Sequence, residues 1–536
     1  MTGALSAACS KISTQVIKNG QTGSGTIPGT LRYADIEEPT SLNPLLRLDA
    51  VSTDQDMFVF GFFFNLDDKE HWVPELATEV PTYQNGGISK DGLTITYHLR
   101  HGVKWQDGQP FTAHDCVFTE HAIMNPANDV VSRSGWDQIA SVAAPDPYTF
   151  VIHLKRIYAP AIASYFAVSG EYPVLPAHLL EKYPDMNHVP FNTHPIGTGP
   201  FKFVKWIHGD HIEWVANPDY WRGPPKLKRI IYHIIPNDQT ILTQLQTHEL
   251  DAWFRAPSSL ISEFKDLHGF RVELTPTNAF AHIDFSFKNP IFDDVRVRQA
   301  INYAIDKKLL IHNVTHDVDV PGYSDQPSFS WAYDPDVEHY DFDPAKAAEL
   351  LDEAGWKLGP GGVRVKDGQR LAFNLSTVAG GTTGVLAETY VQQMLKKAGI
   401  DAGVKNYPTA LFFADYQQGG ILQTGKYDMA FFSWVAGVDP DDKSLYACAS
   451  IPPNGQNDMY WCDPKIDATE NLALSTYDQN VRKKYYLAIQ KMLTTDSPTI
   501  FTWYVRSISV TSLNFQNFKP APAVTSNWNT WEWEMK

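Results

Sequence analysis

Segment 91–118 constrains the fold more than any other part of the chain, because it contains the patterns of a strand, a turn and a capped helix in succession. Apolar and polar side chains alternate from Leu93 to Arg100, and this period of two predicts a strand with one buried face. Thr112 and Asp115 have the spacing of a capping box, which predicts that a helix begins there. No evident nucleophile or metal ligand lies in this segment, so it indicates a fold rather than a chemistry.

Length and charge limit the class of protein. A chain of 536 residues exceeds what one hydrophobic core usually holds, which predicts two or three domains. The formal net charge of -17 argues against a nucleic-acid partner, which would favour a basic face. No apolar run reaches the length of a bilayer crossing, so we do not expect a transmembrane protein.

The pattern changes between residues 371 and 434, where short apolar strands alternate with helical spacing. Segment 427–434 is a largely apolar run, typical of a strand buried on both faces. The order β-α-β-α-β predicts a parallel sheet with crossover helices. Ligands of such sheets bind beyond the carboxyl ends of the strands, which makes the loop 435–442 the expected place of a ligand.

Three stretches carry a resemblance to a known family: LRHGVKWQDGQPFTAHDCVF, PIGTGPFKFVKW with NPDYWRGPPKLKRI, and DDVRVRQAINYAID. They resemble the extracytoplasmic solute-binding proteins of peptide- and nickel-type ABC importers (family 5, oligopeptide- and dipeptide-binding proteins). The resemblance covers nearly the whole chain after residue 30 and implies a two-lobed α/β fold of the periplasmic-binding-protein type (type II, cluster C) with an extra inserted α+β domain. The implied parts are 1–30 as signal remnant and flexible tether, 31–57 with 195–278 and 505–536 as lobe I, 58–194 as the inserted small domain, and 279–504 as lobe II.

The resemblance also implies a function: the substrate-binding component of an ABC importer, which captures di- or oligopeptides between its lobes. Such a protein delivers its cargo to a membrane permease and its ATPase subunits, works in the periplasm or on the outer face of the cell membrane, and is a monomer. It binds no nucleic acid, needs no cofactor or metal, and is no enzyme. The closest alternative is a non-peptide solute, such as an oligosaccharide or chelated nickel. A secreted hydrolase is less favoured, because GxSxG and HExxH motifs are both absent.

The ligand-binding residues are less clear than the family. In peptide-binding relatives, an aspartate three residues after a tryptophan matching Trp434 holds the amino terminus of the peptide. Here that position is Gly437, and Asp439 is the nearest substitute, although Asp439-Pro440 also has the form of a helix cap. The candidate ligand contacts are Ser52, Thr53, Asp54, Gln55 and Asp56, which we expect in a loop, together with Trp434, Gly437 and Asp439.

The four cysteines suggest three different roles. Cys9 follows Leu-Ser-Ala-Ala, which resembles the end of a bacterial lipoprotein signal, so we expect a lipid there, although no basic n-region precedes it. The alternative is an accidental thiol. A disulfide between Cys448 and Cys462 would close a short loop and contribute about 3 kcal/mol on the chain-entropy model; two free thiols are the alternative. Cys116 is expected to be a small buried hydrophobic residue.

Overall fold

The computed structural model describes residues 14–19, 25–47, 49–170, 172–524 and 526–536, and it divides into two compact units. The larger unit comprises Thr14–Thr275, Ser475–Tyr477 and Ser507–Lys536. The smaller unit comprises Pro276–Leu474 and Asp478–Arg506. The larger unit contains most of the predicted lobe I and all of the predicted inserted domain, and the boundary between those two stays a prediction.

The larger unit is built on a mixed sheet with the strand order β20-β11-β2-β10-β9-β8. β2 lies parallel to β10, whereas β8 and β9 form an antiparallel hairpin. β12 and β20 belong to both units, since each of these long strands continues from one unit into the other. The strands are β1 (Gln15–Asn19), β2 (Thr30–Asp35), β8 (Phe201–Ile207), β9 (His211–Ala216), β10 (Arg229–Ile234), β11 (Ala252–Trp253), β12 (Phe270–Phe285) and β20 (Thr499–Ser512).

A second, three-stranded sheet in the larger unit includes the strand of segment 91–118. Its order is β5 (Thr94–His98), β7 (Thr149–Leu154) and β6 (Ile139–Asp146), and α2 (Ala113–Met124) packs against β6 and β7. The capping box is confirmed: the Thr112 backbone N–H donates to Asp115 Oδ2 at 2.9 Å. The strand prediction is confirmed as well, with its apolar face buried in the core of this unit.

Helix α1 (Ala50–Val59) includes residues 52–56, which the sequence analysis expects in a loop. The helix begins at Ala50 because the Asp49 side chain accepts a hydrogen bond from the Ser52 backbone N–H at 2.7 Å and caps the first turn. Gly197 packs against its other end, where a Cβ would lie 1.9 Å from the Val59 carbonyl oxygen. The Gly197-Thr-Gly199 run therefore serves close backbone packing.

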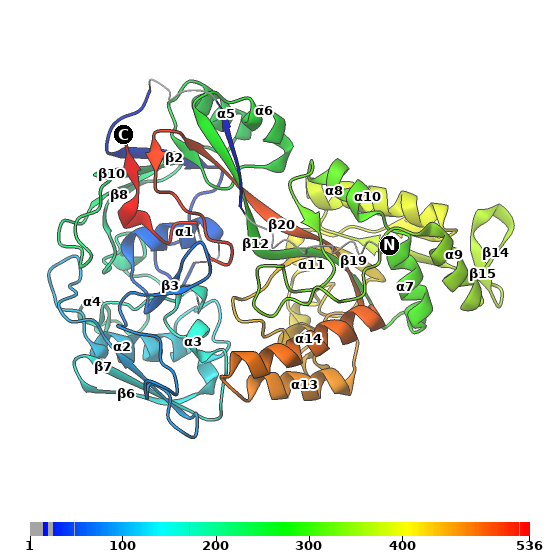
Figure 1. Cartoon of the computed structure of the whole chain (residues 1–536), viewed down its shortest axis with the longest axis horizontal. Helices are drawn as coiled ribbons and strands as arrows, with labels where there is room; N and C mark the ends of the chain where they lie inside the picture. Colours follow the sequence, from blue (N-terminus) through cyan, green and yellow to red (C-terminus); the bar gives the residue numbers. More distant parts are fainter. Residues whose placement is uncertain (1–13, 20–24, 48, 171, 525) are drawn as a thin grey trace, which may run out of the picture. The chain divides into compact units, whose positions relative to one another are not determined.

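The smaller unit contains the predicted β-α-β-α-β run, which is confirmed (Figure 1). Its strand order is β18-β17-β19-β12-β20, and β17 is parallel to both β18 and β19. β12 is antiparallel to β19. The elements of the run are β17 (Ala372–Ser376), α10 (Thr382–Lys397), β18 (Asp401–Val404), α11 (Thr409–Phe412) and β19 (Met429–Val435).

Further helices complete the smaller unit. α7 (Val295–Tyr303) packs against α9 (Pro344–Glu353), and α13 (Pro464–Leu474) lies beside α14 (Gln479–Asp496) (Figure 1). Asp294 caps α7 and Asp343 caps α9. The remaining α-helices described in the two units are α3 (Ala161–Ser164), α4 (Ala177–Leu180), α5 (Asp238–Gln246), α6 (Ile261–Lys265), α8 (Lys307–Val314) and α12 (Lys443–Tyr446). The short strands are β3 (Phe64–Leu66), β4 (Trp72–Pro74), β13 (Val320–Pro321), β14 (Lys357–Leu358), β15 (Arg364–Lys366), β16 (Gln369–Arg370), β21 (Phe515–Gln516) and β22 (Glu534–Met535).

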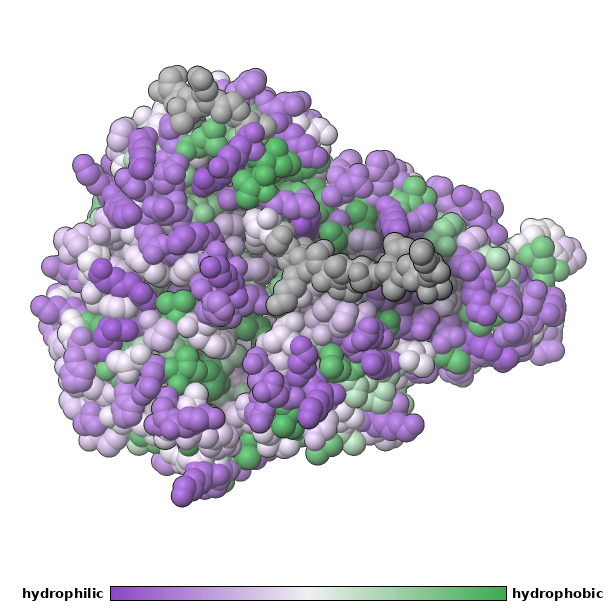
Figure 2. Space-filling view, viewed as in Figure 1, coloured by the Kyte–Doolittle hydropathy of each residue, from purple (hydrophilic) through white to green (hydrophobic). Residues whose placement is uncertain are grey.

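The surface is predominantly polar on the face that Figure 2 shows, where hydrophobic side chains are scattered in small groups. Large exposed hydrophobic residues include Val204, Ile207 and Val215 on the β8–β9 hairpin. Among the described residues, no helix combines the length and hydrophobicity that a bilayer crossing requires.

Candidate functional site

Trp434, near the end of β19, lies between two cavities of the smaller unit. It is paired with Phe280 of β12 and packs against the buried rings of Phe280, Phe501 and Tyr504. One cavity, of about 200 Å³, is lined by the loop that follows β19. The other, of about 380 Å³, is lined by β19, the segment after α11 and residues 453–458. Both cavities lie where a ligand is expected from the strand order, beyond the carboxyl end of β19.

The smaller cavity, which we call the acidic pocket, is defined by Phe280, Gln326 and four carboxylates: Asp325, Asp439, Asp441 and Asp442. No Lys, Arg or His lines it in the described part of the chain. Asp325 and Asp442 are only 1% and 6% exposed. Within the described residues, no donor reaches Asp325 Oδ1 or Asp442 Oδ1. A cationic guest or a carboxyl proton is therefore required to satisfy these oxygens.

Burial explains how the acidic pocket avoids a large unpaired charge when empty. Burial raises the pKa of Asp442 well above its usual range, and the adjoining carboxylates of Glu470 and Asp325 raise it further. Burial also raises the pKa of Glu470, which is fully buried, to about 8 and that of Asp441 to about 6. Asp442 contacts both Asp325 and Glu470, so these three groups share protons near neutral pH.

Asp439 has a different partner from the one that the sequence suggests. Its two carboxylate oxygens accept hydrogen bonds from Arg482 Nη1 and Nη2 of α14, both at 2.6 Å. The two side chains are nearly buried, at 13% and 6% exposed. The helix-cap interpretation of Asp439 is wrong, because Asp442 occupies the N-cap position of α12. Its role as a ligand anchor stays a prediction, and Arg482 already neutralises its charge.

The larger cavity, which we call the aromatic pocket, combines rings with polar groups. Its walls include Phe413, Phe432 and Trp434, and its polar lining includes Asp415, Gln423 and Asp458. Again, no Lys, Arg or His of the described chain lines it. The cavity is thus suited to a guest with an apolar stem and a polar or positive end.

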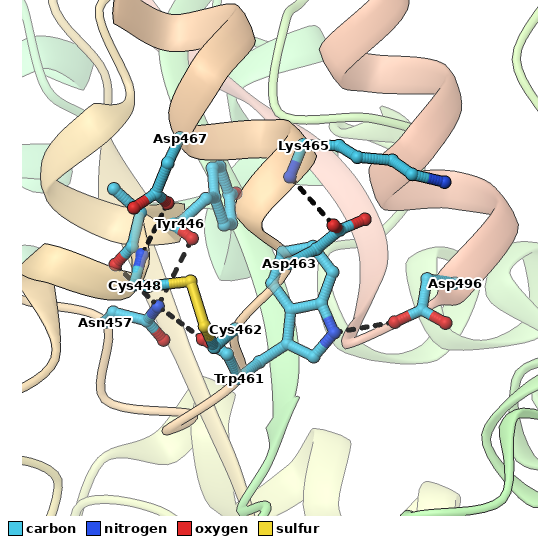
Figure 3. Close-up of a disulfide and its surroundings, with 10 residues drawn as sticks. Tyr446, Cys448, Asn457, Trp461, Cys462, Asp463, Lys465, Asp467 and Asp496 are labelled. Atoms are coloured by element: carbon cyan, nitrogen blue, oxygen red, sulfur yellow. Dashed lines mark hydrogen bonds between the residues drawn. A yellow bond between two sulfur atoms is a disulfide. The ribbon is translucent and has the colours of Figure 1, made fainter.

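A disulfide joins Cys448 and Cys462 (Figure 3). The loop that it closes forms one wall of the aromatic pocket. Inside this loop, the buried Asn457 Nδ2 donates to the carbonyl oxygens of Tyr446, Ala447 and Trp461. The Trp461 indole N–H donates to Asp496 at 2.6 Å. The covalent bond and these hydrogen bonds together fix the position of the wall.

The candidate contacts at 52–56 lie on helix α1 of the larger unit, so the prediction that they form a loop is wrong. Ser52, Gln55 and Asp56 are buried. Gln55 holds two aromatic partners: its Nε2 donates to the Tyr33 hydroxyl at 2.7 Å, and its Oε1 accepts from Trp214 Nε1 at 3.0 Å. These contacts give Gln55 a structural role in the core.

Asp56 and Asp54 differ in their surroundings. Asp56 pairs with the buried Arg47 at 2.6 Å, which fixes the start of α1. Thr53 and Asp54 are partly exposed. Burial raises the pKa of Asp54 to about 6, opposed by Arg255, whose Nη1 lies 3.5 Å away. Thr53 and Asp54 therefore remain candidate ligand contacts within the larger unit.

Three carboxylates of the acidic pocket and Arg482, which binds Asp439 from outside that pocket, are not among the residues that the sequence predicts. Asp441 and Asp442 stand in the visible run DPDD, so this local signal could have identified them. Asp325 and Arg482 come from segments far from β19 in sequence, and no local pattern points to them. Cys9 lies outside the described residues, so the expected lipid site is not part of this geometry.

Comparison with known proteins identifies what the chain resembles. The model of the bacterial extracellular solute-binding proteins, family 5, matches residues 71–456. The oligopeptide-binding protein AppA of Bacillus subtilis is 27% identical over 504 residues, covering 92% of this chain and 89% of that protein. The glutathione-binding protein GsiB of Pectobacterium atrosepticum is 27% identical over 487 residues, covering 90% of each chain.

Two solved structures extend the similarity to the fold. NikZ from Campylobacter jejuni, in complex with nickel and L-histidine, has a TM-score of 0.77 and 29% identity, over 95% of this chain and all of that one. AppA from Bacillus subtilis, in complex with a nonapeptide, has a TM-score of 0.74 and 25% identity, over 97% of this chain and all of that one. The predicted family resemblance and the predicted two-lobed α/β fold class are both confirmed.

Proposed function

Because the chain belongs to family 5 of the bacterial extracellular solute-binding proteins, we propose that it captures peptides outside the cytoplasm and delivers them to the permease of an ABC importer. The observation that carries the peptide assignment is the acidic pocket beside Trp434, which has four carboxylates and no cationic lining residue among those described. A free peptide offers one ammonium group at its amino terminus, which is the charge that this pocket lacks.

The chemistry of the pocket supports capture of an ammonium group. A hydrogen bond to a charged group contributes about 1.5–3 kcal/mol, or roughly 10- to 100-fold in affinity. Asp441 is the carboxylate best placed for direct contact, because it is half-buried and burial raises its pKa only to about 6. At neutral pH it is therefore mostly ionised, whereas the carboxyls behind it share protons. Gly437 lines the same pocket and contributes no side chain to it.

Calorimetry with tripeptide and tetrapeptide pools tests this proposal. We expect peptides with free amino termini to bind at least about tenfold more tightly than their N-acetylated forms. Asp441→Asn should remove most of this difference, and the exposed Asp401→Asn should leave it unchanged. Equal affinity for free and acetylated peptides would reject the ammonium subsite, whereas a failure of every peptide to bind would reject the peptide function.

A chelated metal is the second candidate cargo, favoured by the similarity to the nickel–histidine complex of NikZ. In the described part of the chain, no group of three His, Cys, Asp or Glu residues could hold a metal ion directly. The cargo of this alternative would therefore be an organic chelate whose amino or carboxylate groups contact the protein. Elemental analysis of the protein after dialysis with Ni²⁺ and L-histidine, compared with Ni²⁺ alone, distinguishes this cargo from a peptide.

The family and its structural neighbours are binding proteins, and we propose that this chain likewise leaves its cargo chemically unchanged. Mass spectrometry of a bound peptide after prolonged incubation should show only the intact peptide. We also propose a monomer that is anchored to the membrane by a lipid on Cys9, a proposal that the sequence before Cys9 supports. An alkyne-labelled fatty acid should be incorporated into the wild type in bacterial cells and not into Cys9→Ser.

A further inference from the structure

Building on the peptide-binding function proposed above, we propose that the aromatic pocket selects a basic side chain, Lys or Arg, of the bound peptide. The pocket is separate from the acidic pocket but shares Trp434 with it. Its volume of about 380 Å³ falls within the range of small-molecule sites, about 300–1,000 Å³. It can therefore hold a long side chain.

The walls suit the hydrocarbon stem and the positive end of such a side chain. Phe413, Phe432 and Trp434 contribute rings, and Phe413 lies edge-on to Phe432 with their centroids 6.1 Å apart. The methylene groups of Lys or Arg pack on such rings, and a cation over an aromatic face gains electrostatic attraction. A small or polar side chain would leave these rings without contacts.

Two carboxylates supply the negative charge. Asp458 is 8% exposed, and its Oδ1 accepts a hydrogen bond from Gln423 Nε2 at 2.8 Å. Asp415 is exposed, and no Lys, Arg or His of the described chain forms an ion pair with it or with Asp458. A guest ammonium or guanidinium would thus meet one buried and one exposed carboxylate that have no cationic partner.

The surroundings of Asp458 favour a cation over other guests. Burial and the charge of nearby Asp284 raise the pKa of Asp458 to about 8, so ionised Asp458 is disfavoured in the empty protein. A guest cation offsets both effects, and the carboxyl proton leaves to solvent as the ion pair forms. An acidic side chain would be repelled, and a purely apolar one would bury the amide of Gln423 and the Asp458 carboxyl without new partners.

The wall opposite the rings is held in place by the disulfide loop. Residues 453–458 line the pocket, and Gln456 N–H donates to the Ser444 carbonyl at 3.0 Å. The Tyr460 hydroxyl donates to the Gln423 carbonyl at 2.6 Å. This bond links the disulfide loop to Gln423, whose side-chain amide donates to Asp458. The cavity is therefore preformed, which reduces the ordering cost of binding.

Calorimetry with matched side chains tests the proposal. Alanine tripeptides carry the guest residue at each position in turn, with Lys compared with norleucine and Arg compared with citrulline, which lack the positive charge. At one position or more, we expect the charged peptide to bind at least about tenfold more tightly. The all-alanine peptide measures the proposed peptide function independently of this pocket.

The variants assign the selectivity to the pocket. Asp458→Asn and Asp415→Asn should each reduce the Lys-to-norleucine ratio, and Asp401→Asn, the matched surface control, should leave this ratio unchanged. Circular dichroism and urea denaturation check that each variant is folded. The pocket assignment is overturned if the Lys and norleucine peptides bind with equal affinity, or if both variants keep the wild-type Lys-to-norleucine ratio. The peptide function stands in either case. If no peptide binds, both are overturned.

Discussion

Arg482 shows at the scale of single residues how a distant side chain determines the chemistry of the loop after β19. Its guanidinium holds both oxygens of Asp439, and it also donates to the Ala473 carbonyl and the Tyr486 hydroxyl. Burial alone would lower the pKa of Arg482, but the charge of Asp439 raises it overall, so the guanidinium stays charged. The pair explains why Asp439 is not the free carboxylate that the sequence suggests.

Removing Arg482 should therefore be costly. Arg482→Ala leaves the nearly buried Asp439 without its partner, and we expect the free energy of unfolding to fall by about 3–5 kcal/mol in urea denaturation. Arg370→Ala is the matched control, because its pair with Asp401 is more than half exposed on both sides and contributes at most about 1 kcal/mol. Equal losses in the two variants would show that the Asp439 pair is not stabilising.

Glu470 gives the protein a pH dependence of predictable sign. Its pKa in the folded chain is about 8, above the usual 4.5, so between these values the folded state holds a proton that the unfolded state has lost. Its contribution is complete below about pH 4.5 and is lost as the pH rises through 8. We expect the free energy of unfolding to fall by up to about 1.4 kcal/mol per pH unit for this proton.

Urea titrations between pH 5 and pH 8 measure this slope. Glu470→Gln cannot titrate, so its slope should be shallower than that of the wild type. Glu349→Gln, an exposed carboxylate paired with Lys346, is the control and should keep the wild-type slope. A wild-type slope in Glu470→Gln would contradict the proton sharing with Asp442.

At the scale of elements, the capping box of α2 is the local feature on which the fold prediction depends most directly. Thr112→Ala removes the side chain that accepts from the third residue of the helix, and the expected loss is about 1 kcal/mol of unfolding free energy. Thr94→Ala, on the neighbouring strand β5, is the comparison, because Thr94 caps no helix. If Thr112→Ala has the same free energy of unfolding as the wild type, the cap does not contribute to stability.

Elements with a local signal were predictable, and those that depend on distant contacts were not. Period-two alternation and helical spacing identified β5 and the run from β17 to β19, because their patterns are complete within a few turns or strands. α1 was misplaced because its start depends on one side chain, Asp49, in a loop without other helix signals. In the site, DPDD was visible, but Asp325 and Arg482 reach the loop only through tertiary packing.

At the scale of the whole molecule, the chain consists of two compact units connected through β12 and β20 and by short links at residues 474–478. Because only a few chain segments connect the units, the units can close on a ligand. Such closure is a common response of two-lobed binding proteins. We expect the radius of gyration from solution scattering to decrease when a peptide binds and to return when the peptide is removed. An unchanged scattering profile with a bound peptide would contradict closure.

The Asp439–Arg482 pair has a consequence for how this protein's cargo preference can evolve. A single replacement at position 482, on a helix that the pockets do not include, would release a carboxylate beside Trp434 without a change in the sequence of the loop. New selectivity can thus arise by remote substitution while every lining residue stays the same. Directed-evolution libraries for altered cargo should therefore include α14 as well as the pocket walls.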